Sequence, residues 1–263
     1  MIKNLPILIP LFFILSSQVG AQSDTIPTIV ADRPTQAESP YLVKKCYFQL
    51  ETGGIYVNRN EPQDEIEQIS LGTTMIRYGV FENLEVRASG SFEIVNIKSE
   101  TEETDSTISG IGPISAGFKV FVVKEKGIRP QMAIVGNITI RYLGHEHFSP
   151  TYSYPIGKLV CSHTLSKRFT LGYNGGFGYN GENPDGYFLY AVFLGFKISH
   201  LVWSFIEVYG NFDHGNLPNH LADAGLTFRI RNNLQADISG GMGFDKDVDR
   251  YFVSAGLSWR IPN

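Results

Sequence analysis

Two short motifs carry residue types that bind metal ions. The tripeptide His-Glu-His at 145–147 offers two imidazoles and a carboxylate, which are donors that zinc accepts. Alternate residues of an irregular loop need not converge on one ion, so a polar loop without metal is the simpler interpretation. Asp245, Asp247 and Asp249 imitate the start of a calcium-binding loop, but Arg250 stands where that loop requires glycine. We therefore expect no resident metal, although the two histidines stay open as ligands.

The sequence GFGYNG at 176–181 matches the fingerprint of a dinucleotide-binding loop. That fingerprint binds pyrophosphate only where it follows a strand and opens a helix. The sequence ENPDG follows at 182–186 and predicts a loop instead. We therefore expect no nucleotide cofactor, and we expect Gly172, Gly176 and Gly178 to keep a crowded inner face of a strand small.

Nucleophilic catalysis has no recognisable motif in the chain. No nucleophile elbow occurs, and no serine or cysteine lies in a hydrolase motif beside a histidine and a carboxylate. Catalytic groups on distant strands would leave no such local motif, so an enzyme stays the less favoured alternative. We expect a protein that is not an enzyme.

The largest set of chemically active side chains consists of charged residues that alternate with apolar ones along the chain. Carboxylates and cations placed this way can pair across an enclosed space. Two interpretations stay open: a network of salt bridges that holds a wall together, and a polar constriction that selects what passes. The set comprises Glu51, Arg77, Glu85, Arg87, Lys119, Arg129, Arg141, Lys197, Glu207, Asp223, Arg229, Asp237 and Arg260.

The elements that position these residues show period-two alternation from about residue 45 onward, which is typical of strands. The clearest segment, 84–97, sets Val86 and Ala88 on one face and Arg87 and Ser89 on the other. The same pattern predicts about twelve strands, near 45–58, 66–79, 84–98, 110–123, 128–143, 156–166, 169–181, 187–198, 202–213, 220–230, 233–245 and 250–261.

The connections between these strands alternate in length. An even number of strands with short turns on one side and long loops on the other is typical of an all-β transmembrane antiparallel up-and-down barrel. A soluble sandwich would also alternate, but nothing would require its loops to do so. Closure of the last strand on the first would pair every backbone group and place both termini in the periplasm. Tight turns are expected at 80–83, 124–127, 167–168, 199–201 and 231–232, and longer loops at 59–65, 99–107, 144–155, 182–186, 214–219 and 246–249.

The start of the chain has the features of a secretory signal. Lys3 precedes an apolar stretch, Leu5–Leu15, and a small-residue cleavage site ends near Ala21. We therefore expect a signal peptide at 1–21, a proline-containing segment at 22–44 that is either a periplasmic lead or an inserted plug, and a barrel at 45–263 in the bacterial outer membrane.

The net charge and the number of cysteines exclude some classes of partner and scaffold. The formal net charge of −4 disfavours nucleic acid as a partner. The two cysteines are too few for a disulfide-built scaffold.

The charges of the connections predict the orientation of the barrel. We expect the loops that carry acidic residues to lie outside the cell and the turns that carry basic residues to lie in the periplasm. The acidic set is Glu61, Asp64, Glu65, Glu100, Glu102, Glu103 and Asp105, and the basic set is Lys124, Lys126, Lys167, Arg168 and Arg231.

Several stretches together resemble a family of Gram-negative outer-membrane proteins catalogued as putative MetA-pathway of phenol degradation. The resemblance covers nearly the whole mature chain and lies in ADRPTQAESP at 31–40, FQLETG at 48–53, RYG at 77–79, LEVR at 84–87, FIEVYG at 205–210, DAG at 223–225 and QADISGG at 235–241.

The resemblance implies an outer-membrane transporter barrel of about twelve strands that passes small hydrophobic or aromatic compounds. Its expected partners are outer-membrane lipid, such a solute and the barrel-assembly machinery. Many such barrels end on an aromatic residue that assists assembly, whereas this chain ends four residues beyond Trp259. The alternative function is a non-transporting structural or surface-binding barrel whose lumen is filled by its own side chains.

Overall fold

The computed structural model describes residues 28–61, 64–99, 105–182, 185–213, 219–244 and 249–262. The expected signal peptide at 1–21 lies outside these ranges, as do Asp245 and Asp247 of the calcium-like motif. The described residues form an all-β structure. Its strands are β1 (Phe48–Asn60), β2 (Asp64–Phe81), β3 (Leu84–Ser99), β4 (Ser106–Ile111), β5 (Ile114–Val123), β6 (Gln131–Ile140), β7 (Tyr154–Thr164), β8 (Phe169–Tyr179), β9 (Gly186–Lys197), β10 (Val202–Asp213), β11 (Asn219–Arg231), β12 (Leu234–Gly243) and β13 (Asp249–Ile261).

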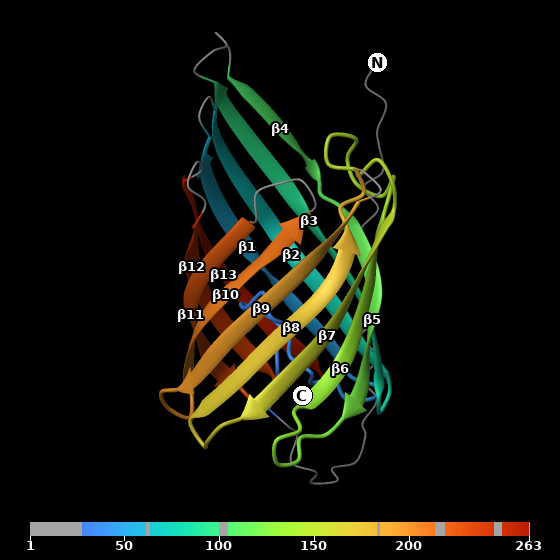
Figure 1. Ribbon diagram of the computed structural model, residues 1–263, viewed down its shortest axis with the longest axis vertical. Coiled ribbons are helices and arrows are strands. Elements are labelled where there is room, and N and C mark those ends of the chain that lie inside the picture. Colours follow the sequence, from blue (N-terminus) through green and yellow to red (C-terminus); the bar gives the residue numbers. More distant parts are fainter. Residues whose placement is uncertain are drawn as a thin grey trace, which may run out of the picture.

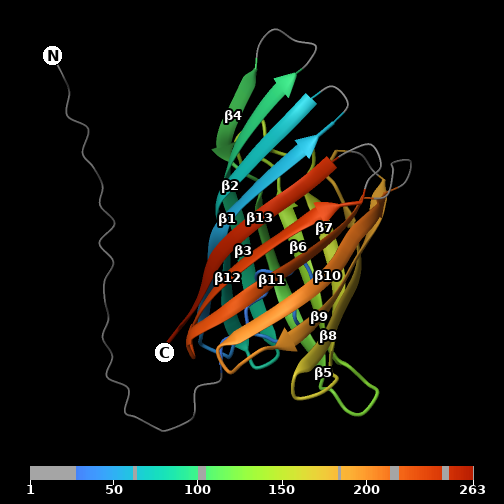
Figure 2. The same ribbon diagram turned by 90° about the vertical axis from the view of Figure 1, so that its left-hand side faces the viewer.

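The strands form one closed antiparallel barrel (Figures 1 and 2). Strands that follow one another in sequence pair with each other, except that β5 pairs with β3 and not with β4. β13 pairs with β1 along their whole lengths, from Phe48 opposite Ile261 to Asn60 opposite Asp249. Closure leaves no long free edge, which a lipid environment would not tolerate. The predicted antiparallel barrel of about twelve strands is therefore confirmed, with one additional short strand.

The additional strand corrects the expected single strand at 110–123. Both β4 and β5 pair with β3. β5 pairs with the first half of β3, and β4 pairs with the second half of β3. The break between them falls at Gly112 and Pro113. Proline has no backbone N–H to donate to a ladder, so the strand ends there and begins again at Ile114.

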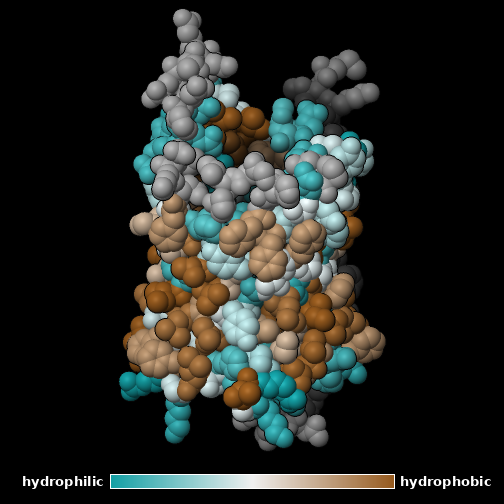
Figure 3. Space-filling view, viewed as in Figure 1, coloured by the Kyte–Doolittle hydropathy of each residue, from teal (hydrophilic) through white to brown (hydrophobic). Residues whose placement is uncertain are grey.

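The two faces of each strand differ as the alternation predicts. On β13, Tyr251, Val253 and Leu257 are exposed outside the barrel, whereas Ser258 and Arg260 are buried inside. Apolar side chains gather across the middle and lower part of the visible face, above a hydrophilic rim (Figure 3). No helix among the described residues is long and apolar enough to cross a membrane. The apolar outer surface of the strands fits contact with lipid.

The segment before β1 lies inside the barrel, and we call its described residues 28–47 the plug. The Ile29 N–H donates to the Asn232 carbonyl at 2.7 Å, and the Cys46 N–H donates to the Gly79 carbonyl at 2.8 Å. Asn232 and Gly79 both lie beside tight turns, so the plug enters and leaves at that end, which we call the turn side. The opposite end is the loop side. Leu42 of the plug packs on a buried apolar cluster of Ala133, Val135 and Val160.

Candidate functional site: a plugged lumen

Asp32 of the plug lies at the centre of a buried cluster of charges. Its carboxylate accepts hydrogen bonds from Arg87 and Lys119, each at 2.8 Å, and lies 3.3 Å from the Arg77 guanidinium. Burial by itself would raise the pKa of Asp32, but the three cations hold that pKa well below its usual range. Asp32 is therefore a carboxylate at every physiological pH, and it joins three strands of the wall to the plug.

Glu38 is the second acidic anchor of the plug. It pairs with Arg87, and its other oxygen accepts a hydrogen bond from the Lys158 ammonium at 2.8 Å. Burial acts to raise the pKa of Glu38, but Lys158, Arg87 and Lys119 lower it further than burial raises it. Because Lys158 lies on β7 and Arg87 on β3, Glu38 connects walls on different sides of the lumen.

The wall contributes its own carboxylates to this cluster. The Arg77 guanidinium, fully buried, donates to Glu51 at 2.8 Å and to Glu85 at 2.8 and 2.9 Å. Asp32, Glu38 and these two glutamates face Arg77, Arg87, Lys119 and Lys158, so the named charges balance. Removing one partner of such a buried network leaves an unpaired charge, which typically costs about 3–5 kcal/mol.

Wall carboxylates also bind the backbone of the plug. Glu207 accepts hydrogen bonds from the Gln36 and Ala37 N–H groups, both at 2.7 Å. Glu51 accepts from the Asp32 and Arg33 N–H groups at 3.0 Å. These bonds depend on the path of the chain and not on side-chain identity at the donor positions, so they fix the shape of the plug.

Arg33 ties the plug to β12 and β13. Its guanidinium donates to Asp237 at 3.2 Å and to Ser254 at 3.0 Å. It lies against Gly53 and Gly256, where an added Cβ would come within 2.6 and 2.4 Å of Arg33 side-chain nitrogens. Glycine at both positions is what allows the guanidinium to lie against the strand backbone.

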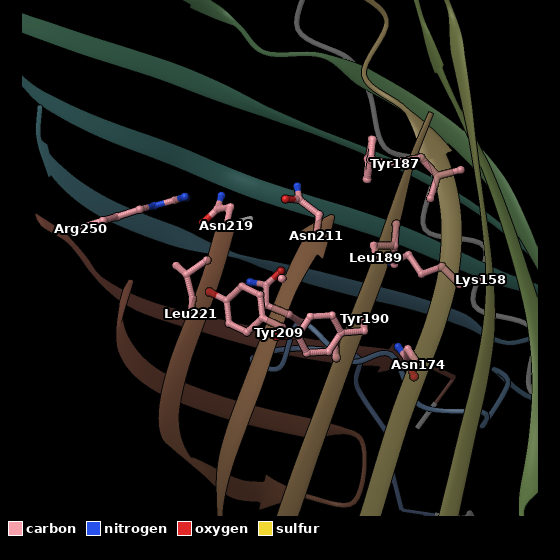
Figure 4. A pocket seen from close by; sticks show the side chains of 14 residues that line it. Lys158, Asn174, Tyr187, Leu189, Tyr190, Tyr209, Asn211, Asn219, Leu221 and Arg250 are labelled. Carbon is pink, nitrogen blue, oxygen red and sulfur yellow. The ribbon is translucent and has the colours of Figure 1, made fainter. Parts of the chain in front are cut away.

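Cavities lie on both sides of the plug. Two loop-side cavities, of about 290 and 350 Å³, share Gln36 and Lys158 in their walls. Figure 4 shows the first of them, with side chains such as Tyr209 and Asn211 projecting from the strands toward the space that Lys158 and Asn174 border. A turn-side cavity of about 330 Å³ lies below the plug.

The expected lumenal residues fall into two groups. Nine of them are buried inside the barrel, and the remaining four lie toward its ends. Arg129 is exposed in a turn, Arg141 stacks on the Tyr142 ring at 4.3 Å, the Lys197 ammonium lies 5.7 Å from the Trp203 ring centre, and Arg229 lines the turn-side cavity. The buried group comprises Glu51, Arg77, Glu85, Arg87, Lys119, Glu207, Asp223, Asp237 and Arg260.

The sequence analysis missed the plug side chains that complete the cluster. Asp32 and Glu38 fall in a segment without strand pattern, so no alternation placed them inside. The only signal for them was their position in the family-like stretch at 31–40. Lys158 was missed as well, although it alternates with the outward Leu159 on β7.

The other sequence motifs have structural roles. The His145 and His147 rings stack with centres 5.4 Å apart, and the His145 N–H donates to the Ile111 carbonyl at 2.7 Å. Among the described residues no group of three potential metal ligands comes together. GFGYNG at 176–181 lies on β8 and the turn after it, so the dinucleotide interpretation fails for lack of a helix.

The fold resembles solved outer-membrane barrels at low sequence identity. The COG4313 outer membrane channel from Pseudomonas putida F1 is 8% identical, with a TM-score of 0.60 over 84% of this chain and 97% of that one. The translocator domain of the autotransporter NalP from Neisseria meningitidis is 11% identical, with a TM-score of 0.56 over 81% and 88%. The NanC porin is 8% identical, with a TM-score of 0.51 over 80% and 98%.

No curated protein is significantly similar to this chain in sequence. A family profile, however, matches residues 31–261, which includes most of the plug and every described strand. The match begins at Ala31, beside the Asp32 that anchors the charge cluster. The chain belongs to the family described as "Putative MetA-pathway of phenol degradation".

Proposed function

We propose that this barrel is an outer-membrane channel for small solutes, in which the plug divides the lumen and controls passage. The observation that carries this proposal is the thinness of the division. Arg33 and Thr35 line both a loop-side cavity and the turn-side cavity. A solute in one cavity is therefore separated from the other cavity by one layer of plug residues. A displacement of these plug residues would join the two spaces.

The solute class follows from the family and from the cavity lining. The family description points to phenol degradation, and the COG4313 protein of the same fold is described as an outer membrane channel. The turn-side cavity contains Phe193, Trp203 and Phe205. We infer that the solutes are small hydrophobic or aromatic compounds and that the lumenal charges set a polar constriction around their route.

The location is part of the same proposal. Export through a signal peptide at 1–21, followed by the barrel-assembly machinery, would place the apolar outer face in outer-membrane lipid. Trp259, exposed on that face, is the candidate for the aromatic assembly signal.

One observation favours a second candidate, a structural barrel that transports nothing. The charge cluster around Asp32 fills the lumen between β2, β3 and β5 with paired side chains. If the remaining lumen were equally closed, the plug would be a permanent brace of the wall. The two candidates differ in one measurable property, which is permeability.

Uptake by proteoliposomes tests the proposal. The purified mature chain would be reconstituted into liposomes, and benzenesulfonate, a permanently charged aromatic probe that does not cross lipid, would be added outside them. A bulky tetrasaccharide added in the same way is the comparison. We expect benzenesulfonate uptake above that of empty liposomes and above that of the sugar. Absence of uptake for both probes, together with absence of conductance in planar bilayers, would overturn the channel in favour of the structural barrel.

A further inference from the structure

The turn-side cavity differs in character from the loop-side cavities. Its wall is mainly apolar, with plug residues on one side and β7 to β12 on the other. Its volume of about 330 Å³ is roughly twice that of a 150 Å³ protein cavity that binds benzene. One aromatic ring with a substituent would therefore fit.

Three aromatic rings face this cavity from adjacent strands. Phe193 lies on β9, and Trp203 and Phe205 lie on β10. Pro34 and Pro40 of the plug line the same cavity. Flat apolar surfaces from both plug and wall make a slot of the kind that aromatic ligands occupy, since aromatic pairs add attraction beyond burial alone.

Two glycines keep these rings out of the cavity volume. An added Cβ at Gly172 would lie 2.0 Å from the Phe193 ring, and one at Gly225 would lie 2.6 Å from the Phe205 ring. Each ring therefore rests against the backbone of the neighbouring strand. The slot exists because the chain has glycine at both positions.

Two arginines line this cavity, and one of them, Arg33, is already paired with Asp237. Arg229 lines the cavity two residues before the end of β11, on the turn side. Its guanidinium makes no hydrogen bond or ion pair with any residue in the described ranges, in contrast to the buried arginines of the charge cluster. A guanidinium with open donors suits a carboxylate, which it can bind through two hydrogen bonds.

We propose that the turn-side cavity is a binding site for a small aromatic acid. The ring of the ligand lies between Phe193, Trp203 and Phe205, and its carboxylate meets Arg229. The site rests on the proposed function, because it would hold a solute after it has passed the plug. It adds to that function a defined ligand class and a defined position.

Tryptophan fluorescence can report on this site directly. The chain has two tryptophans, Trp203 in the slot and Trp259 on the outer face. In a Trp259→Phe background, Trp203 is the remaining tryptophan. We expect benzoate to change its fluorescence with saturation. Cyclohexanecarboxylate, which has the same charge and no aromatic ring, should bind several-fold more weakly. Equal affinity for the two acids would overturn the aromatic part of the proposal.

Two variants test the geometry of the site. Arg229→Gln should raise the benzoate Kd about tenfold, because it removes the charge-assisted bonds. Gly172→Ala should weaken benzoate at least as much, because it pushes the Phe193 ring into the slot. Gly157→Ala is the matched control, since nothing lies within 4 Å of the added Cβ, and it should leave the Kd unchanged.

The outcomes separate this site from the channel proposal. Uptake of benzenesulfonate without saturable benzoate binding at Trp203 would overturn the site and leave the channel standing. Saturable binding that Arg229→Gln and Gly172→Ala weaken, in a barrel that transports nothing, would support the site and overturn the channel. Saturable binding that neither variant weakens would place the ligand elsewhere and overturn the site.

Discussion

The Lys119 ammonium donates to the Asp32 carboxylate at 2.8 Å, across 87 residues of sequence. Lys119 is fully buried on β5, and Asp32 belongs to a plug segment with no regular secondary structure. Asp32 also faces Arg77 and Arg87, and the Lys119 ammonium also lies 3.8 Å from Glu38 of the plug. This ion pair therefore couples the position of the plug to the closure of the barrel.

Asp32→Asn tests that coupling. The substitution leaves Arg77, Arg87 and Lys119 facing one another with less opposing charge, so we expect a loss of about 3–5 kcal/mol in the free energy of unfolding. The measurement is the urea midpoint of the detergent-solubilised barrel, followed by heat-modifiable gel migration. Glu61→Gln is the control, because its ion pair with Arg59 is exposed, and such pairs contribute about 0–1 kcal/mol. A similar loss in both variants would contradict the role of the cluster.

Acid should loosen the plug only at low pH. The pKa values of Asp32 and Glu38 are lowered in the folded protein, so their contribution is fully present above their ordinary values near 4. It is lost as the pH falls from there through the lowered values. We expect thermal stability to change little through these groups between pH 7 and about pH 5 and to fall below about pH 4. The double variant Asp32→Asn/Glu38→Gln should show a weaker fall, and an equal fall would assign the acid sensitivity to other groups.

Ala88 and Ser89 lie on opposite faces of β3. Ala88 is exposed outside the barrel, and Ser89 lines a loop-side cavity. Ala88→Arg should impair folding into lipid, because a basic side chain near the midplane of the lipid face costs about 2–4 kcal/mol. Ser89→Arg should fold and should alter uptake if the lumen is the route. Normal folding of the first variant with failure of the second, scored by gel migration after refolding in lipid, would reverse the assigned faces.

The orientation of the barrel is testable on cells. The sequence predicts acidic loops outside the cell and basic turns in the periplasm, and Lys124, Lys126 and Arg168 do lie at the turn side where the plug enters. An epitope inserted near Glu103 should be labelled on intact cells. Labelling that requires permeabilised cells would place the loop side in the periplasm instead.

The wall of this barrel could be predicted from sequence because lipid and lumen select opposite residue types at alternate positions. Arg87 stands between Val86 and Ala88, so Arg87 must face the lumen while its two neighbours face lipid. A shift of the strand register by one residue would place Arg87 in hydrocarbon. The break at Pro113 was not predicted, although proline is a residue that interrupts strands. The strong alternation on both sides of Pro113 favoured one continuous strand.

The plug could not be placed in the same way. Its residues follow no period, and their partners are set by closure of the barrel, which brings β3, β5 and β7 around Asp32 and Glu38.

The turn-side slot could not be predicted for a similar reason. Gly172 was expected to keep an inner face small, but the Phe193 ring that rests on it comes from the next strand, and only the register of β8 and β9 joins them.

Single-channel conductance of Glu207→Ala tests most directly whether the plug controls passage. The variant leaves the Gln36 and Ala37 N–H groups without their carboxylate acceptor, and hydrogen exchange at residues 35–38 would verify that the plug has loosened there. Glu93→Ala is the matched control, because Glu93 is a buried lumenal carboxylate that bonds to Ser70 and Gln68 of the wall. We predict conductance several-fold above that of the unaltered protein for Glu207→Ala and within about twofold of it for Glu93→Ala. Faster exchange at residues 35–38 with unchanged conductance would contradict the account.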